Sequence, residues 1–256
     1  MSKSDLLPKN LSKQRLDMAI CERGLCESRP KAQALILSGA IYVNEIPVTK
    51  AGTFVKSEDK ITRKGEDIPF VSRGGIKLQG ALNEFKVSPK DCICLDIGAS
   101  TGGFTDCFLQ EGAQKVYAVD VGYGQLAWKL QMDPRVISIE RTNFRYIDPT
   151  LIPDPIDLVV IDVSFISLKL IIPVVIPFLA PGAKVLPLIK PQFEIGKEDV
   201  GKGIVTDPIL HQRVLNELRA FFTKAGFIVS EPVSSSILGP KGNQEFFCLL
   251  QRPPLK

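Results

Sequence analysis

The 256-residue chain contains a single histidine, and this scarcity excludes several kinds of chemistry. A Ser-His-Asp or Cys-His catalytic set would have to use His211, which lies in the amphipathic helical pattern ILHQRVLNEL, far from any nucleophile motif. We therefore expect His211 to be an ordinary helix residue. The six cysteines include no CxxC pair, so the sequence predicts neither a metal site nor a disulfide scaffold.

The sequence also lacks a long apolar run. The longest run, Leu170 to Ala180, is interrupted by Pro173 and Pro177, so it is too short and too broken to span a bilayer. The first ten residues, MSKSDLLPKN, contain no apolar core of a standard secretory signal. Together with cysteines that we expect to be reduced, these features predict a cytoplasmic protein.

The residues that are present predict a globular protein with an uneven charge distribution. Hydrophobic residues make up 45% of the chain and charged residues 23%, which allows a sizeable core. Residues 1–75 hold 13 Lys and Arg against 9 Asp and Glu, a net charge of +4, whereas residues 76–256 hold 19 of each. A small basic module before a larger neutral one is typical of a polyanion-binding appendage, and an ordinary solvated face is the alternative.

Within the basic third, the pattern predicts two helices followed by short strands. SKQRLDMAICERGL has apolar residues near helical spacing, and Ser28 can cap a second helix that runs through KAQALIL, with Pro30 in its first turn. IYVN and EIPVTKAGTFV are typical of short β structure. Three cations are then expected to face one phosphate backbone, namely Arg15, Arg29 and Lys31.

Residues 13–75 resemble the S4 RNA-binding domain, on the segment RLDMAICERGLCESRPKAQALILSGAIYVNEIPVTKAG. The resemblance implies docking on structured RNA through shape and phosphate contacts rather than base reading. Pro69 and the Gly74–Gly75 pair interrupt regular structure in IPFVSRGG. We therefore expect an N-terminal tail over residues 1–12, an S4-like domain over 13–67 and a linker over 68–75.

From residue 92 onward, short apolar runs alternate with helical segments, a pattern that indicates a parallel α/β sheet. The runs CICLDI, KVYAVDV, LVVIDVSFI and AKVLPLIKPQF each carry a polar residue at or near the carboxyl end. These residues are Asp96, Asp120, Asp162 and Lys190. Because ligands of such sheets bind beyond the carboxyl ends of strands, the four residues predict a built site.

The glycine loop after the first run narrows the choice of ligand. Its glycines, Gly98, Gly102 and Gly103, have the spacing G-x-x-x-G-G rather than the dinucleotide pattern G-x-G-x-x-G. Asp120 follows about two dozen residues later, where an acid can bind ribose hydroxyls. An acidic crevice favours a cationic nucleoside such as S-adenosylmethionine over NAD, whose pyrophosphate it would repel, and glycines that serve only a turn are the alternative.

The ordered motifs LDIGASTGGFTD, YAVDVGYGQLAWKL, ERTNFR, VVIDVSFISL, LIKPQFE and VGKGIV make the chain similar to the TlyA, or hemolysin A, family from Lys13 to Gln251. Members are ribosomal RNA methyltransferases with an S4 domain fused to an FtsJ-like catalytic domain. The resemblance implies a Rossmann-like α/β methyltransferase sheet over residues 76–252, with helices on both faces, preceded by a small α+β S4 domain. It also implies S-adenosylmethionine-dependent 2′-O-methylation of ribose in ribosomal RNA.

The same resemblance assigns site residues. FtsJ-like enzymes use a Lys-Asp-Lys-Glu set, which here falls on Lys77, Asp162, Lys190 and Glu245. The donor pocket is expected to be formed by Asp96, Gly98, Gly102, Phe104, Asp120, Asn143 and Asp162. Related enzymes often carry Asp where Asn143 stands, and an amide there can both donate to and accept from an adenine edge.

Methyl transfer requires a ribose hydroxyl that is aligned opposite the sulfur and loses its proton. Lys190 is the candidate proton acceptor. A free lysine has a pKa of about 10.4, so the amine must be neutral part of the time, which burial and the like charge of Lys77 favour and Asp162 opposes. In the alternative mechanism both lysines stay charged and stabilise the developing alkoxide, while Glu245 positions Lys77 or the ribose.

Two further expectations concern the rest of the second domain. Trp128 is expected in core packing between helix and sheet, with stacking on a target base as the alternative. The segment from Phe193 to Val205 is expected to form a loop near Lys190 that closes over the site or meets RNA through Lys197 and Lys202, or is simply solvated.

Two other functions remain open at this point: an RNA- and nucleoside-binding module without catalysis, and a membrane-active hemolysin.

Overall fold

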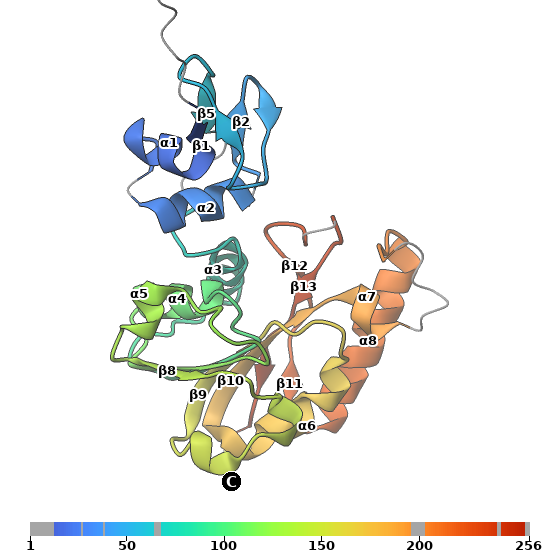
Figure 1. Ribbon diagram of the computed structural model, residues 1–256. Coiled ribbons are helices and arrows are strands. Elements are labelled where there is room, and N and C mark those ends of the chain that lie inside the picture. Colours follow the sequence, from blue (N-terminus) through green and yellow to red (C-terminus); the bar gives the residue numbers. More distant parts are fainter. Residues whose placement is uncertain are drawn as a thin grey trace, which may run out of the picture. The chain divides into compact units, whose positions relative to one another are not determined.

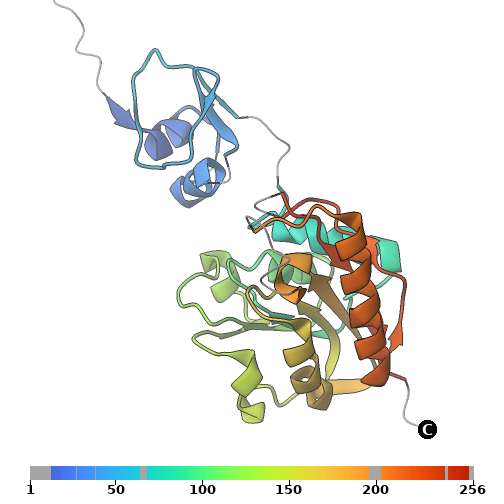
Figure 2. The ribbon, with the colours of Figure 1, turned by 90° about the vertical axis from the view of Figure 1, so that its right-hand side faces the viewer.

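The structure is a computed structural model that describes residues 13–26, 28–37, 39–63, 68–195, 203–239 and 242–253. The chain divides into two compact units, Met1–Asp67 and Ile68–Lys256. Figure 1 and Figure 2 show the helices and strands of both units. Within the described ranges, no helix is long and apolar enough to cross a membrane.

The first unit packs two helices against short strands. Its helices are α1 (Leu16–Glu22) and α2 (Arg29–Leu37), and its strands are β1 (Gln14–Arg15), β2 (Ile41–Val43), β3 (Ile46–Pro47), β4 (Phe54–Val55) and β5 (Ile61–Arg63). Strand β1 pairs with β4, and β2 lies between β3 and β5. The backbone N–H of Lys31 donates to the Ser28 hydroxyl at 3.4 Å, so Ser28 caps α2 as expected.

The core of this unit comes from one apolar face of each helix and from the strands. Its fully buried residues include Leu16, Ile20, Ile36, Ile41 and Val55. Leu16 and Ile20, which stand at helical spacing in the sequence, are thus both on the buried face of α1, and the polar faces of α1 and α2 are left for other contacts.

The second unit is built on a mixed sheet with the strand order β11-β14-β10-β9-β6-β7-β8. Its parallel strands are β6 (Ile93–Ile97), β7 (Lys115–Val119), β8 (Val136–Ile139), β9 (Ile156–Ile161) and β10 (Leu179–Ile189). Antiparallel strands extend the sheet beside β10; they are β11 (Ile228–Val229), β12 (Val233–Ser234), β13 (Phe246–Phe247) and β14 (Leu250–Gln251). The four apolar runs of the sequence thus correspond to β6, β7, β9 and β10.

Both faces of this sheet are buried. In β6, Cys94 packs with the cluster that contains Leu78 of α3 (Gly74–Phe85), whereas its neighbour Leu95 packs with the cluster that contains Phe222 of α8 (Pro208–Lys224). Successive residues of a strand point to opposite faces, so an apolar residue at every position requires cover on both sides. Figure 1 shows α3 and α4 on one face and α6 and α8 on the other.

The helices that provide this cover differ in length. They are α3 (Gly74–Phe85), α4 (Gly103–Gln110), α5 (Trp128–Gln131), α6 (Ile172–Val175), α7 (Pro191–Glu194) and α8 (Pro208–Lys224), with short 3-10 turns η1 (Phe144–Tyr146), η2 (Pro149–Leu151), η3 (Leu168–Leu170) and η4 (Ile176–Phe178). The expected Rossmann-like α/β architecture with helices on both faces is therefore present. It brings the carboxyl ends of β6, β7, β9 and β10 to one edge of the sheet.

The segment expected to be a linker, residues 68–75, differs from that expectation. Phe70 is buried in the core of the second unit, and the Val71 N–H donates to the Asp106 carboxylate at 2.8 Å. Helix α3 already begins at Gly74. A buried aromatic ring and a hydrogen bond to a nearly buried carboxylate tie this segment to the second unit, so the boundary between the units lies at Asp67.

This packing makes Gly75 intolerant of a side chain. A Cβ built on Gly75 would lie 2.2 Å from Cγ of Phe70. We expect Gly75→Ala to displace the ring and to lower the free energy of unfolding by about 1–3 kcal/mol, although alanine favours the helix. Denaturant titration of the full chain measures this change. The control is Gly80→Ala in the same helix, whose Cβ would meet only the movable Ser236 side chain; equal stability of the two variants would contradict the prediction.

Candidate active site

The glycine loop begins where β6 ends and is fixed against two neighbouring strands. Gly98 has a φ of +89°, and a Cβ there would lie 2.3 Å from the carbonyl oxygen of Asp162. Its N–H donates to the carbonyl of Val119 at the end of β7, and the Asp162 N–H donates to the carbonyl of Ile97, each at 2.8 Å. Only glycine permits both this backbone conformation and this approach, so the loop passes directly over the end of β9.

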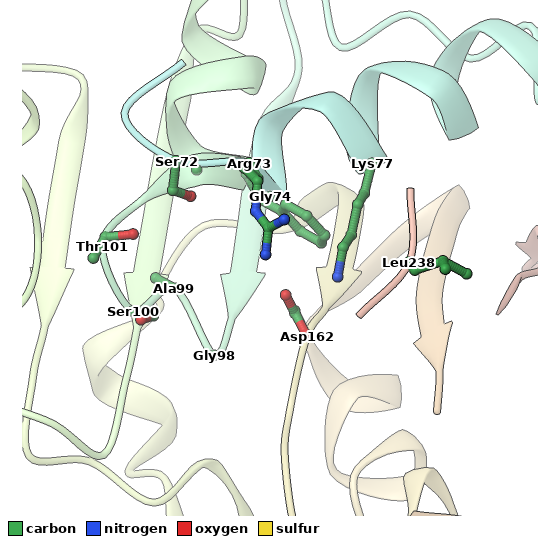
Figure 3. A pocket seen from close by; sticks show the side chains of 12 residues that line it. Ser72, Arg73, Gly74, Lys77, Gly98, Ala99, Ser100, Thr101, Asp162 and Leu238 are labelled. Atoms are coloured by element: carbon green, nitrogen blue, oxygen red, sulfur yellow. The ribbon is translucent and has the colours of Figure 1, made fainter. Parts of the chain in front are cut away.

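A pocket of about 230 Å³ opens above this loop. It is lined by Ser72, Arg73, Gly74, Lys77, Gly98, Ala99, Ser100, Thr101, Gly103, Phe104, Asp162 and Leu238. Figure 3 shows the side chains of Arg73 and Lys77, from the start of α3, directed toward Asp162 at the end of β9. The pocket therefore joins two cationic side chains, one carboxylate and the backbone of a glycine loop.

Lys77 forms a buried ion pair with Glu245. The Lys77 Nζ lies 2.6 Å from Glu245 Oε2, and the two side chains are 9% and 1% exposed. Glu245 directly precedes β13, and a Cβ on Gly239 would lie 2.5 Å from its other oxygen, Oε1. Leaving one charge of such a pair buried alone costs roughly 3–5 kcal/mol. Lys77 is therefore buried in its ion pair, although it lies on a helix at the edge of the pocket.

Lys190 forms a second ion pair, with Asp162. The Lys190 Nζ lies 2.6 Å from Asp162 Oδ1 and donates to the Ser164 hydroxyl at 3.2 Å. Lys190 follows the last residue of β10, so both partners stand at the carboxyl ends of adjacent parallel strands. The four residues of the expected Lys-Asp-Lys-Glu set thus form two ion pairs, and one member of each pair, Lys77 and Asp162, lines the pocket.

Asp96 lies beneath the glycine loop and is fully buried. Its Oδ2 accepts a hydrogen bond from the Thr105 hydroxyl at 2.7 Å, whereas Oδ1 has no hydrogen-bond partner among the described residues. Burial, reinforced by the nearby charges of Asp162 and Asp120, raises the pKa of Asp96 to about 7. Asp96 was expected at the donor pocket, but it is not among the residues that line the pocket above the glycine loop.

Three other residues expected at the donor site lie outside the pocket lining. Asp120 accepts the Ser100 N–H at 2.8 Å and the Gly122 N–H at 2.6 Å, so its carboxylate shapes the two loops that flank it. A Cβ on Gly102 would lie 2.2 Å from a Leu130 methyl group, which shows that this glycine faces the core. Asn143 is exposed and caps η1 through the Arg145 N–H.

Besides other residues of the glycine loop, the structure adds pocket residues that were not expected at the site: Ser72, Arg73, Gly74 and Leu238. Arg73 belongs to SRGG, which was interpreted as part of a linker because of its glycines. A Cβ on Gly103 would lie 2.2 Å from the Ser72 hydroxyl, so the start of α4 packs closely against this segment. The signal that could have identified Arg73 is its position one helical turn before Lys77, which places both on one face of α3.

Trp128 is not in the core, contrary to expectation, because its side chain is 72% exposed. Helix α5 spans only four residues and buries Leu130 instead, against Gly102. His211 lies in α8 as expected, where its Nε2 is 2.9 Å from the Val205 carbonyl oxygen. Lys197 and Lys202, the proposed loop contacts, lie outside the described residues.

The cations expected to bind RNA lie in the first unit. Arg15 and Arg29 both bind the carboxylate of Asp17, and Lys31 is exposed on α2.

All six cysteines are free thiols. No group of three or more metal-ligating side chains is found within the described residues.

Asp96 gives a prediction for the pH dependence of stability. Because its pKa of about 7 lies above that of an unfolded aspartate, the folded state binds the proton more tightly, and stability falls as pH rises from about 4 to 7. We expect Asp96→Asn to lose less stability between pH 5 and pH 8 than the native chain does. Urea unfolding at both pH values measures the difference. Asp91→Asn, an exposed control, should behave like the native chain, and an unchanged pH dependence in Asp96→Asn would refute the prediction.

Comparisons with known proteins agree with this architecture. The FtsJ-like methyltransferase family matches residues 70–252, and the S4 domain matches residues 14–61. The Bacillus subtilis protein YqxC is 51% identical over 243 residues, which cover 94% of this chain and 86% of the relative. The Mycobacterium tuberculosis protein named 16S/23S rRNA (cytidine-2′-O)-methyltransferase TlyA is 42% identical, over 93% of this chain and 89% of its own. Hemolysin A of Brachyspira hyodysenteriae is 45% identical, over 91% of this chain and 97% of its own length.

Solved structures show the same fold. A Streptococcus thermophilus structure superposes with a TM-score of 0.75 at 43% identity and covers 95% of this chain and 90% of that one. The N-methyltransferase NodS of Bradyrhizobium japonicum, solved with S-adenosyl-L-homocysteine, shares the fold alone, at 14% identity and a TM-score of 0.50. With an S4 domain before an FtsJ-like methyltransferase domain, and close relatives along nearly its whole length, the chain belongs to the TlyA (hemolysin A) family.

Proposed function

We propose that the protein is an S-adenosylmethionine-dependent methyltransferase that modifies a ribose 2′-hydroxyl of ribosomal RNA. The proposal rests on two short ion pairs, Lys77–Glu245 and Lys190–Asp162. Both lie beside the glycine loop, where the carboxyl ends of the parallel strands meet. The TlyA relative of Mycobacterium tuberculosis is named for this activity on 16S and 23S rRNA. An rRNA substrate would place the protein with ribosomes in the cytoplasm.

The residues around the glycine loop suit a cationic nucleoside. The pocket opens on the backbone of the glycine loop, which Gly98 allows to pass over the end of β9, and on the carboxylate of Asp162. Asp120 adds a carboxylate beside the loop, where it accepts the Ser100 N–H. When bound, S-adenosylmethionine supplies the methyl group as a reactive sulfonium. Asp162 would bind the positively charged part of this donor, and Asp120 would bind its ribose hydroxyls.

The two lysines and their partners would surround the acceptor hydroxyl. Asp162 lines the pocket and pairs with Lys190, so it would hold the Lys190 amine near the acceptor hydroxyl. Glu245 holds Lys77 in the pocket wall. The hydroxyl oxygen forms a bond to the methyl carbon as the carbon–sulfur bond breaks, and its proton leaves, either to a neutral Lys190 or, with both lysines charged, to water.

Substitution of Lys190 tests the proposed chemistry. We expect Lys190→Ala to reduce methyl transfer by roughly 10²- to 10⁴-fold while donor binding stays nearly unchanged, because the lysine acts on the acceptor. Lys190→Arg then separates the two roles: a guanidinium can stabilise an alkoxide but cannot accept a proton. Labelled-methyl transfer to ribosomal subunits gives the rate, and calorimetry gives the donor affinity.

The control for this experiment is Lys169→Ala, since Lys169 pairs with Glu217 on α8 and does not line the pocket. It should keep native activity. Undiminished transfer by Lys190→Ala would refute the assignment of Lys190. No transfer by the native chain to either subunit, with the donor bound, would instead support a binding module without catalysis.

Docking through the first unit predicts a strong salt dependence of RNA affinity. Arg15, Arg29 and Lys31 are exposed or half-exposed cations of the S4 domain. If they contact phosphates, replacing any one by alanine should weaken binding and reduce the slope of log affinity against log salt by about 1. Fluorescence titration with ribosomal RNA at several salt concentrations measures both. Lys224→Ala, at the end of α8, is the control, and a flat salt response of the native chain would remove the docking role.

A further inference from the structure

The carboxylate of Asp17 is the centre of a hydrogen-bond cluster in the first unit. Arg15 donates to it twice, from Nε to Oδ1 and from Nη2 to Oδ2, each at 3.0 Å. Arg29 donates from Nε to Oδ2 at 2.9 Å, and Gln33 donates to the same oxygen at 3.0 Å. One acid thus binds three side chains from β1 and α2, and two of them are cations expected to meet RNA.

The cluster has a buried side and an exposed side. Asp17 is fully buried, whereas the side chains of Arg15 and Arg29 are 39% and 53% exposed. An arginine carries five N–H donors, and Asp17 binds two of Arg15 and one of Arg29, so each guanidinium keeps donors for another anion. The two arginine side chains are the exposed part of the cluster, and a guanidinium has the planar fork geometry that matches phosphate.

Burial of the carboxylate requires these partners. Hydrogen bonds from Arg15, and then from Gln33 and Arg29, hold the pKa of Asp17 well below its usual range although burial opposes this. The carboxylate is therefore charged at neutral pH. Two cations on one anion leave a net positive charge, and the side chains are ordered before any RNA arrives. Ordering in advance lowers the entropic cost of binding.

We propose that Asp17 is a positioning residue for RNA docking, which holds Arg15 and Arg29 together as a preformed receptor for the phosphate backbone. This inference rests on the proposed function, because it presupposes that the S4 domain docks on RNA. It adds that an acid, which by its charge repels RNA, strengthens RNA binding through the two arginines that it orients.

The sign of one substitution separates positioning from simple charge. Asp17→Asn raises the net charge of the chain by one, so electrostatic attraction alone predicts tighter RNA binding and a steeper salt dependence. Positioning predicts the opposite, because the amide binds the guanidinium groups poorly and both arginines regain rotamer freedom. Glu22→Gln is the matched control: it makes the same charge change on an exposed acid of the same helix, α1.

The experiment measures methyl transfer from labelled S-adenosylmethionine to purified ribosomal subunits, with the full-length chain. For Asp17→Asn we expect the KM for subunits to rise about tenfold, which corresponds to roughly 1.4 kcal/mol of binding free energy. The kcat at saturating subunits and the KM for the donor should not change, because both belong to the second unit. Glu22→Gln should show the native KM or a slightly lower one.

A second pair of variants covers the case in which Asp17→Asn fails to fold, as judged by circular dichroism. Arg15→Lys and Arg29→Lys keep each positive charge, but an ammonium cannot bind Asp17 and a phosphate with the fork of a guanidinium. Positioning predicts that Arg15→Lys raises the KM for subunits nearly as much as Arg15→Ala does. A native KM in both lysine variants would overturn the inference.

The outcomes also separate this inference from the proposed function. If Arg15→Ala and Arg29→Ala leave the KM for subunits unchanged, the S4 domain does not dock through these residues and the proposed docking role fails. If those variants raise the KM but Asp17→Asn lowers it or leaves it unchanged, docking stands and the positioning role of Asp17 is wrong.

Discussion

The pairing of two buried or nearly buried amines with two carboxylates is the constraint on which the site depends. Lys77 and Glu245 are separated by most of the second unit in sequence, and neither charge can be buried without the other. The pair therefore ties the start of α3 to the strand β13, next to the pocket. The second pair, Lys190–Asp162, joins the ends of β10 and β9. Both pairs exist only when the sheet is complete, so the stability of the fold and the geometry of the site are linked.

The glycine loop depends on the same sheet edge. Gly98 can pass over the backbone of Asp162 only because it lacks a Cβ, and this contact places the loop beside the carboxylate that Lys190 binds. Asp96 lies below the loop with one oxygen left without a hydrogen bond in the described structure, a cost that stabilising forces elsewhere must offset. Unpaired polar atoms of this kind concentrate at functional sites, where binding chemistry rather than stability determines the residue.

Much of the fold could be predicted from the sequence, and less of the site. Apolar runs with polar ends predicted β6, β7, β9 and β10, because both faces of a parallel sheet are buried, and family motifs located the four residues of the two ion pairs. The sequence did not predict that Phe70 would anchor the expected linker, or that Trp128 would be exposed. Both outcomes depend on three-dimensional packing, which determines which of several nearby apolar side chains fills the core. It also did not show that Asp96 bonds Thr105 of α4 or that Gly102 packs against Leu130, because sequence patterns do not reveal which side of a turn faces the pocket.

The central claim is that these four side chains direct a methyl group to a sugar oxygen. The most direct test is to incubate the purified protein with ribosomal subunits and labelled S-adenosylmethionine, digest the RNA to nucleosides and identify the labelled products by mass spectrometry. We predict that the label is found in 2′-O-methylated nucleosides. In undigested RNA, the phosphodiester bond next to each labelled ribose should resist alkaline cleavage. Label on the bases, with none on ribose, would contradict it.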